Sequence, residues 1–163
     1  FKRAAISHLN GNACTEETAP VRIWVINFNP GTIGEDQTIC ENTAPVPFTG
    51  TAPSGNGTFT FTWEYSTDGG SNWDPVPGIT TPTYAAPALM VDTWYRRVVT
   101  SSLNGFTCSE MTPPVKVTVN NFDPGTITED QWICEDGTPA PFGSNAPAGV
   151  GTFTYQWQSS LNG

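Results

Sequence analysis

TFTFTWEYS, the stretch Thr58–Ser66, decides the fold class because aromatic residues alternate in it with polar ones. Successive side chains of a β-strand point to opposite faces, so Phe59, Phe61 and Trp63 are expected on one face. Trp63 could stack on a ligand, but an alternating aromatic strand is typical of the buried side of a sheet. The stretch therefore predicts a β-strand that contributes Trp63 to a core.

The same alternation returns 94 residues further along, as TFTYQWQSS at residues 152–160. Working outward, residues 28–69 and 122–163 share 24 identities in 42 aligned pairs, with no gap. Self-similarity at a fixed period is the signature of stacked modules, so the repeat replaces the one-domain expectation for this length. We divide the chain into the C-terminal part of one module (1–27), a complete module (28–121) and the N-terminal part of the next (122–163).

Composition limits the partners that this chain could bind. The net charge is −9, with six Lys and Arg residues against fifteen Asp and Glu residues. Binding to phosphates requires a basic surface, so neither nucleic acid nor anionic lipid is an expected partner. No apolar run approaches the roughly 18 residues that predict a membrane-spanning helix, so no membrane insertion is expected in this segment. Six Trp, nine Phe and four Tyr supply the bulk of a folded core.

Strand signals recur at short spacing through the complete module, whereas Pro or Gly interrupts every stretch with a helical apolar period. Asp68-Gly69-Gly70 is expected to be the turn of a hairpin. The expected strands cover seven stretches: 32–40, 45–49, 58–66, 76–79, 83–86, 94–100 and 115–119. About seven short strands in one module predict an all-β sandwich of two sheets, with a closed barrel as the alternative.

Four segments of the complete module carry a resemblance to a known family. They are QTIC at Gln37–Cys40, FTFTWEYSTDGG at 59–70, TWYRRV at 93–98 and VKVTV at 115–119. Together they resemble the immunoglobulin-like module, related to PKD-type repeats, that stands in tandem in very large surface proteins of gliding and other Bacteroidota. The resemblance implies tandem immunoglobulin-like β-sandwich modules, secretion across the outer membrane by the type IX pathway, and an adhesive or filamentous role. It carries no catalytic residue over to this chain.

Four cysteines occupy two positions of the repeat: Cys14 with Cys108, and Cys40 with Cys134. Cys40 and Cys108 are the two that share one module, so we expect them to form a disulfide that closes a loop of 68 residues. In antibody-type domains the second cysteine follows a tyrosine by two residues, whereas Cys108 follows Tyr95 by thirteen. We therefore expect Cys108 in the turn between the last two strands. A metal site is the competing interpretation, but no Cys-x-x-Cys occurs.

Two charged pairs require an interpretation. Arg96-Arg97 places one basic side chain on each face of its strand, and the inward one needs a carboxylate, a carbonyl or an aromatic ring as partner. Glu35-Asp36, which the repeat copies, stands near the start of a module, where Ca²⁺ could stiffen the joint. No spaced acidic set accompanies the pair, so solvated charge is the expectation and no metal or cofactor is predicted.

The joints between modules hold one lone aromatic residue each, Phe28 and Phe122, followed two residues later by proline. Proline limits the freedom of the joint, and the aromatic ring is expected to pack between adjacent modules. Neighbouring repeats are thus expected partners, and the array is expected to be a semi-rigid rod.

The sequence contains no set of residues suited to catalysis. The lone His8 is not repeated, and the acidic pairs lack the apolar pocket that separates the pKa values of two carboxyls, so no enzyme is expected. We expect a structural stalk or filament repeat of an extracellular adhesin, anchored at the outer membrane of a Gram-negative bacterium. A surface polysaccharide or a host ligand would then be its partner. The alternatives are a carbohydrate-binding or spacer module of a secreted polysaccharide-degrading enzyme, and a self-assembling pilin-like subunit.

Overall fold

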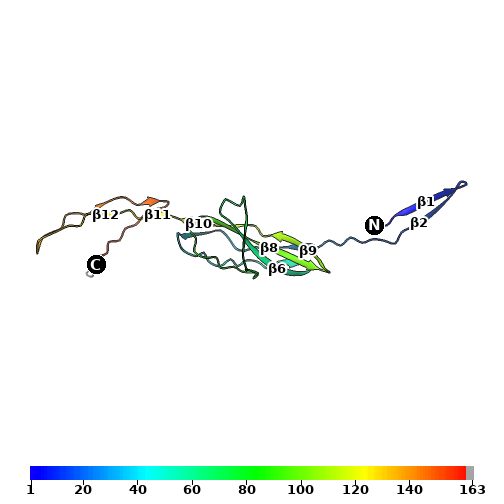
Figure 1. The fold of residues 1–163 in the computed structure, drawn as a ribbon, viewed down its shortest axis with the longest axis horizontal. Helices are drawn as coiled ribbons and strands as arrows, with labels where there is room; N and C mark the ends of the chain where they lie inside the picture. The colour runs from blue at the N-terminus through cyan, green and yellow to red at the C-terminus, as the bar shows by residue number, and fades with distance from the viewer. Residues whose placement is uncertain (161–163) are drawn as a thin grey trace.

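The computed structural model describes residues 1–160, and within this range the chain is all-β, without a helix. Figure 1 shows a central body with an extended segment at each end. The strands, in chain order, are β1 (Ala4–Leu9), β2 (Asn12–Glu17), β3 (Phe28–Asn29), β4 (Gln37–Cys40), β5 (Ser54–Gly55), β6 (Thr58–Ser66), β7 (Asp74–Val76), β8 (Thr93–Leu103), β9 (Phe106–Met111), β10 (Val115–Asn120), β11 (Phe122–Asp123), β12 (Ile127–Thr128), β13 (Gly143–Ser144) and β14 (Ala148–Gly149). The all-β prediction is confirmed.

The main sheet of the central module has the strand order β4-β10-β8-β6-β7. β8 is paired with β6 along the whole length of β6, and β9 and β10 share the other edge of β8. β10 runs antiparallel to β8 but parallel to β4. β4, in the first part of the module, and β10, at its end, therefore lie side by side.

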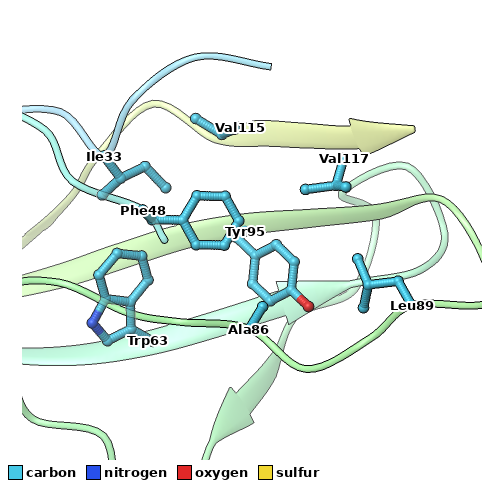
Figure 2. Close-up of a cluster of buried hydrophobic side chains, with 8 residues drawn as sticks. All are labelled: Ile33, Phe48, Trp63, Ala86, Leu89, Tyr95, Val115 and Val117. Atoms are coloured by element: carbon cyan, nitrogen blue, oxygen red, sulfur yellow. The ribbon is translucent and has the colours of Figure 1, made fainter. Parts of the chain in front are cut away.

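One face of this sheet is buried by the alternation that the sequence predicts. Along β8 the residues from Thr93 to Ser101 alternate between buried and half-buried positions. Trp63 of β6 is fully buried, which confirms its assignment to the core. Figure 2 shows the buried cluster, whose members all come from residues 28–121: Ile33, Phe48, Trp63, Ala86, Leu89, Tyr95, Val115 and Val117.

The layer that covers the buried face is mostly irregular. β3 pairs with β5 over two residues, and Phe48 forms an isolated bridge with Tyr84. The expected strands at 45–49 and 83–86 are thus reduced to single bridges. Proline has no backbone N–H to donate to a ladder, which explains why these stretches do not extend into strands. The prolines concerned are Pro45, Pro47, Pro82 and Pro87.

β9 is a strand that the sequence pattern did not predict, and it contains Cys108, which was expected in a turn. The turn lies earlier, at Asn104 and Gly105, whose φ angles are 52° and 83°. A two-residue hairpin turn needs positive φ at both positions, and Asn-Gly is the pair that adopts it most readily. This dipeptide was the signal for the hairpin, but FTCSEM lacks the apolar alternation that would have marked a strand.

The two end segments are partial copies of the central module. β1 and β2 form a hairpin with its turn at Asn10 and Gly11, the counterparts of Asn104 and Gly105. In the C-terminal segment β11 pairs with β14, as β3 pairs with β5. Residues 152–160, the counterpart of β6, form no strand there.

Candidate functional site at the module ends

Arg97 is a buried cation that ties three segments of the module together. Its Nη1 donates to Pro82 O at 2.7 Å, and its Nη2 donates to Pro30 O at 2.8 Å and to Thr51 O at 3.1 Å. The guanidinium also lies 5.3 Å from the centre of the Phe61 ring. Burial lowers the pKa of Arg97 below its usual value. The inward arginine therefore finds carbonyls and an aromatic ring, as the sequence required.

Arg96 points to the other face of the same strand. Its Nε donates to a carboxylate oxygen of Glu64 at 2.6 Å, and its guanidinium stacks 4.1 Å from the centre of the Trp73 ring. Both partners are partly exposed, so the ion pair contributes little stability. The prediction that the arginine pair splits between the two faces is confirmed.

The parallel pair β4–β10 joins the beginning of the module to its end. The pair is in register over four positions, from Gln37 opposite Val117 to Cys40 opposite Asn120. Each end of β10 is held by a carboxylate as well. Lys116 N donates to Asp36 Oδ1 at 2.7 Å before the pair begins. The strand is thus fixed along its whole length.

Asp92 holds the other end of β10. Its Oδ1 accepts from Val119 N at 2.8 Å, and its Oδ2 pairs with Lys116 Nζ at 2.8 Å. The hydrogen bond from Lys116 is the main cause that lowers the pKa of Asp92. Asp36 and Asp92 therefore accept hydrogen bonds from the backbone N–H groups of Lys116 and Val119 in β10. Asp92 also pairs with the side chain of Lys116. No group of three or more His, Cys, Asp and Glu side chains that could hold a metal occurs in residues 1–160.

The beginning of the module is closed by Phe28. Its ring centre lies 5.6 Å from that of Phe59, and a Cβ on Gly55 would stand 2.7 Å from Phe28 Cα. Gly55 has a φ of 127°, so glycine is required here both for the backbone angle and for the close approach. Phe122 repeats the arrangement, with its ring centre 6.1 Å from that of Phe153.

The aromatic contacts of Phe28 and Phe122 therefore lie inside their own modules. We expected both rings to fill the gap between adjacent modules, and these contacts inside each module do not test that expectation. Each ring lies at the start of the module to which it belongs. Packing of the same rings against a preceding module stays a prediction.

The cysteines do not form the predicted bridge. Cys40 and Cys108 are both free and exposed. Cys40 stands opposite Asn120, three residues past the Val117–Thr93 pair, whereas Cys108 stands opposite Ser101. At about 3.3 Å per residue this places the two cysteines roughly 35 Å apart along β8. A disulfide needs Cα atoms within about 7 Å, so the prediction of a Cys40–Cys108 bridge inside one module is wrong.

Asp68 forms the expected turn between β6 and β7. Its carboxylate accepts from Asn72 N at 2.9 Å, from Ser66 Oγ at 2.7 Å and from Ser71 N at 3.0 Å. These bonds, led by the one from the Asn72 backbone, lower the pKa of Asp68 from 3.8 to about 2. The charged form of Asp68 thus organises the turn.

An apolar pocket of about 340 Å³ opens near the C-terminal end of the module. Its wall includes Tyr65, Tyr84, Leu89, Met90 and Tyr95. Burial raises the pKa of Tyr95 to about 12, and its phenol stays neutral. The lining contains no charged or amide side chain, so the polar side-chain groups that it offers are the hydroxyls of Tyr and Thr residues.

In the part of the chain that the structure describes, no helix is long and apolar enough to cross a membrane.

The comparisons with known proteins place the repeat in one family. The sequence profile of a domain of unknown function (DUF8696) matches residues 29–121 and again residues 123–163. The two matches begin 94 residues apart, which is the period of the repeat. No curated protein and no solved structure matches the chain. Since the two matches cover more than half of its residues, the chain belongs to the DUF8696 family of domains of unknown function.

Proposed function

We propose that this repeat is a load-bearing spacer in an array of immunoglobulin-like β-sandwich modules of a secreted, cell-surface adhesin. In this proposal the array extends from the outer membrane of a Gram-negative bacterium and holds an adhesive tip away from the cell. The repeat itself performs no chemistry. The observation that carries the proposal is the parallel pairing of β4 with β10.

Tension along an array enters each module before Gln37 and leaves it after Asn120. β4 is then pulled backwards at its first residue and β10 forwards at its last, because the two strands are parallel and in register. A force in this direction shears the pair, so its hydrogen bonds share the load. A force that separated the strands from one end would break the same bonds one at a time.

Further contacts hold the loaded strands to the rest of the module. Arg97 fixes Pro30, ahead of β4, to the middle of β8. Thr32 and Thr51 exchange backbone-to-hydroxyl hydrogen bonds of 3.0 and 3.1 Å. The side-chain amide of Gln37 accepts from Val46 N at 2.8 Å and donates to Val46 O at 3.1 Å. The segment that enters β4 is thereby anchored before the shear pair begins.

Length is the second property that a spacer needs. β8 alone, with eleven residues, spans about 35 Å at the rise of a β-strand. A module copied at a fixed period adds such an increment without requiring a new surface. A long array would reach well beyond the coat of a cell.

The direction of pulling tests the proposal on one folded protein. In a chain whose native cysteines are replaced by serine, handles on Asn27→Cys and Asn121→Cys load β4 and β10 in shear. Ala44 and Asn121 lie near the same end of the module. Handles on Ala44→Cys and Asn121→Cys therefore pull β10 away from β4 one hydrogen bond at a time, starting at Asn120. We expect a much higher unfolding force in the shear geometry, measured by single-molecule force spectroscopy at equal loading rate.

Two results would contradict a load-bearing spacer. One is an equal unfolding force in both pulling geometries, which would mean that the β4–β10 pair carries no special load. The other is saturable binding of a defined sugar by the isolated module, measured by calorimetry. The second result would assign the repeat to carbohydrate recognition.

A further inference from the structure

Cys40 marks the end of the module at which the chain leaves it. It is the last residue of β4 and stands opposite Asn120, the last residue of β10. Two residues later, Phe122 begins the next module with β11. The thiol is free and exposed at this end.

Cys108 marks the other end, at which the chain enters the module. It stands opposite Ser101, whose Oγ donates to Asn56 O at 2.6 Å. Asn56 N in turn donates to Asn27 O at 3.5 Å. Directly opposed residues of antiparallel strands point to the same face, so Cys108 faces the layer that holds Asn27. Figure 1 shows the β8–β9 hairpin pointing toward the N-terminal segment.

The order of the repeats brings these two positions to one joint. Ile26 is the counterpart of Asn120, one module earlier. The preceding module's counterpart of Cys40 therefore belongs beside Ile26, about 5 Å away across a strand pair. Cys108 stands on the other side of the same joint, next to the residues that hold Asn27.

We propose that the two cysteines form a disulfide between consecutive modules, from the counterpart of Cys40 in one module to that of Cys108 in the next. The two thiols exchange with a small oxidised disulfide such as oxidised glutathione. One sulfur–sulfur bond forms between the modules, and the small disulfide is reduced to two thiols, which take up the two protons and two electrons. The partner of each cysteine is thus a cysteine in a neighbouring copy of the same module.

The separation of the partners explains why all four cysteines of this stretch are unpaired. The two bridged cysteines lie 162 residues apart in sequence, because their positions differ by 68 residues within a module and by one further period of 94 between modules. None of the pairs among Cys14, Cys40, Cys108 and Cys134 has that separation. The inference rests on the tandem order of the modules and does not depend on the load-bearing role.

Mass spectrometry of two proteins tests the bridge. As a monomer treated with oxidised glutathione, the chain of 163 residues should form no disulfide between its own cysteines, each of which should be found as a free thiol or as a mixed disulfide with glutathione. An array of three consecutive copies of residues 28–121, the unit that contains the whole buried cluster, should lose four of its six thiols. Peptide mapping without reduction should join Cys40 of the first copy to Cys108 of the second, and Cys40 of the second to Cys108 of the third.

A matched variant makes the assignment specific. Cys108→Ser in the second copy alone should abolish the first bridge, free one thiol at Cys40 of the first copy, and leave the second bridge intact. A bridge inside one copy, six free thiols in the oxidised array, or loss of both bridges in the variant would each overturn the proposal. The length to which the array extends under force is an independent measure of the bridges. It should increase on reduction only in arrays in which bridges were mapped.

Discussion

Residues 28–66 and 122–160 are near-copies in sequence, yet one is folded into a module and the other is not. Several local features are the same in both. Asn29 Oδ1 accepts from Gly31 N at 2.8 Å, and Asp123 Oδ1 accepts from Gly125 N at 2.8 Å. Gln37 makes two bonds to the backbone of Val46, and Gln131 makes the same two to that of Ala140. Contacts between residues close in sequence therefore form in both copies.

Burial of the aromatic residues and pairing of the aromatic strand differ between the two copies. Trp63 has no exposed surface, whereas its counterpart Trp157 is 67% exposed. Phe48 is 1% exposed and its counterpart Phe142 is 53% exposed. β8 pairs with the aromatic strand of the first copy, whereas within residues 1–160 no strand pairs with residues 152–160. An aromatic alternation becomes a buried strand only when a partner strand covers it.

The N-terminal hairpin teaches the same lesson from the other side. β1 and β2 keep the register of β8 and β9, and Ser7 pairs with Cys14 as Ser101 pairs with Cys108. All residues of β1 are nevertheless exposed, since no counterpart of β6 lies beside it. A hairpin with an Asn-Gly turn thus forms locally, but its inner face is buried only inside a complete module.

Supplying the missing strands should have the largest effect on this comparison. We expect a chain that continues after residue 163 with a copy of residues 70–121 to bury Trp157. Its tryptophan fluorescence should shift to shorter wavelength, and the urea m-value should roughly double as a second module unfolds. The matched control carries Asp at the counterparts of Val99 and Val117 in the added copy. A Trp157 that stays exposed in the extended chain would show that the repeat is not a folding unit.

Truncating the two tryptophans should separate the copies by a smaller amount. Trp63→Ala removes a fully buried side chain and should lower the free energy of unfolding by about 3–5 kcal/mol. Trp157→Ala removes an exposed one and should change it by less than about 0.5 kcal/mol. Urea denaturation followed by circular dichroism measures both. Equal losses would mean that the C-terminal segment is as well packed as the central module.

The buried and exposed arginines form the next matched pair. Arg97→Met leaves buried carbonyls without a donor and should cost about 3 kcal/mol, since each such group costs about 1–3 kcal/mol. Arg3, the exposed counterpart that directly precedes β1, should tolerate the same substitution with almost no change in the denaturation midpoint. If Arg97→Met were as stable as the parent chain, the three carbonyl contacts would not hold the module together.

The smallest expected effect concerns the turn at Asp68, which is a local contact inside the packed module. The pKa of Asp68 is about 2 in the folded chain and 3.8 without its partners. Its charged form is favoured by folding, so its stabilising contribution is present above about pH 4 and is lost as the pH falls toward 2. Asp68→Asn should remove this part of the pH dependence, measured as the thermal midpoint between pH 5 and pH 2. A variant with an unchanged acid profile would contradict the assignment.

Short-range features of the fold were predictable because their causes lie within a few residues. The alternation in Thr58–Ser66 predicted a strand with Trp63 in the core, and the Asp68 turn followed from its own composition. The opposite faces of Arg96 and Arg97 followed from the period of a strand. Each of these depends on backbone geometry that neighbouring residues fix.

The candidate site at the module ends was predicted less well, because it depends on strand order. Pairing Cys40 with Cys108 assumed that two cysteines of one module are close in space. Strand order and register decided otherwise, since the pairing of β4 with β10 places Cys40 at one end of β8 and β9 places Cys108 at the other. The contact of Phe28 with Phe59 of β6 was not predicted either, because it depends on how β6 approaches the start of the module.

The sequence by itself determined the period of 94 residues, the all-β class, the tight turns and the inward or outward direction of side chains along a strand. These properties follow from local backbone preferences and from identity between copies, and both can be read along the chain. Only the tertiary structure decided that β4 lies parallel to β10, that Arg97 reaches three distant carbonyls, and that the cysteines stand at opposite ends. Such contacts join segments far apart in sequence, and burial of apolar surface, which is non-directional, selects among the many arrangements that the same local pattern allows.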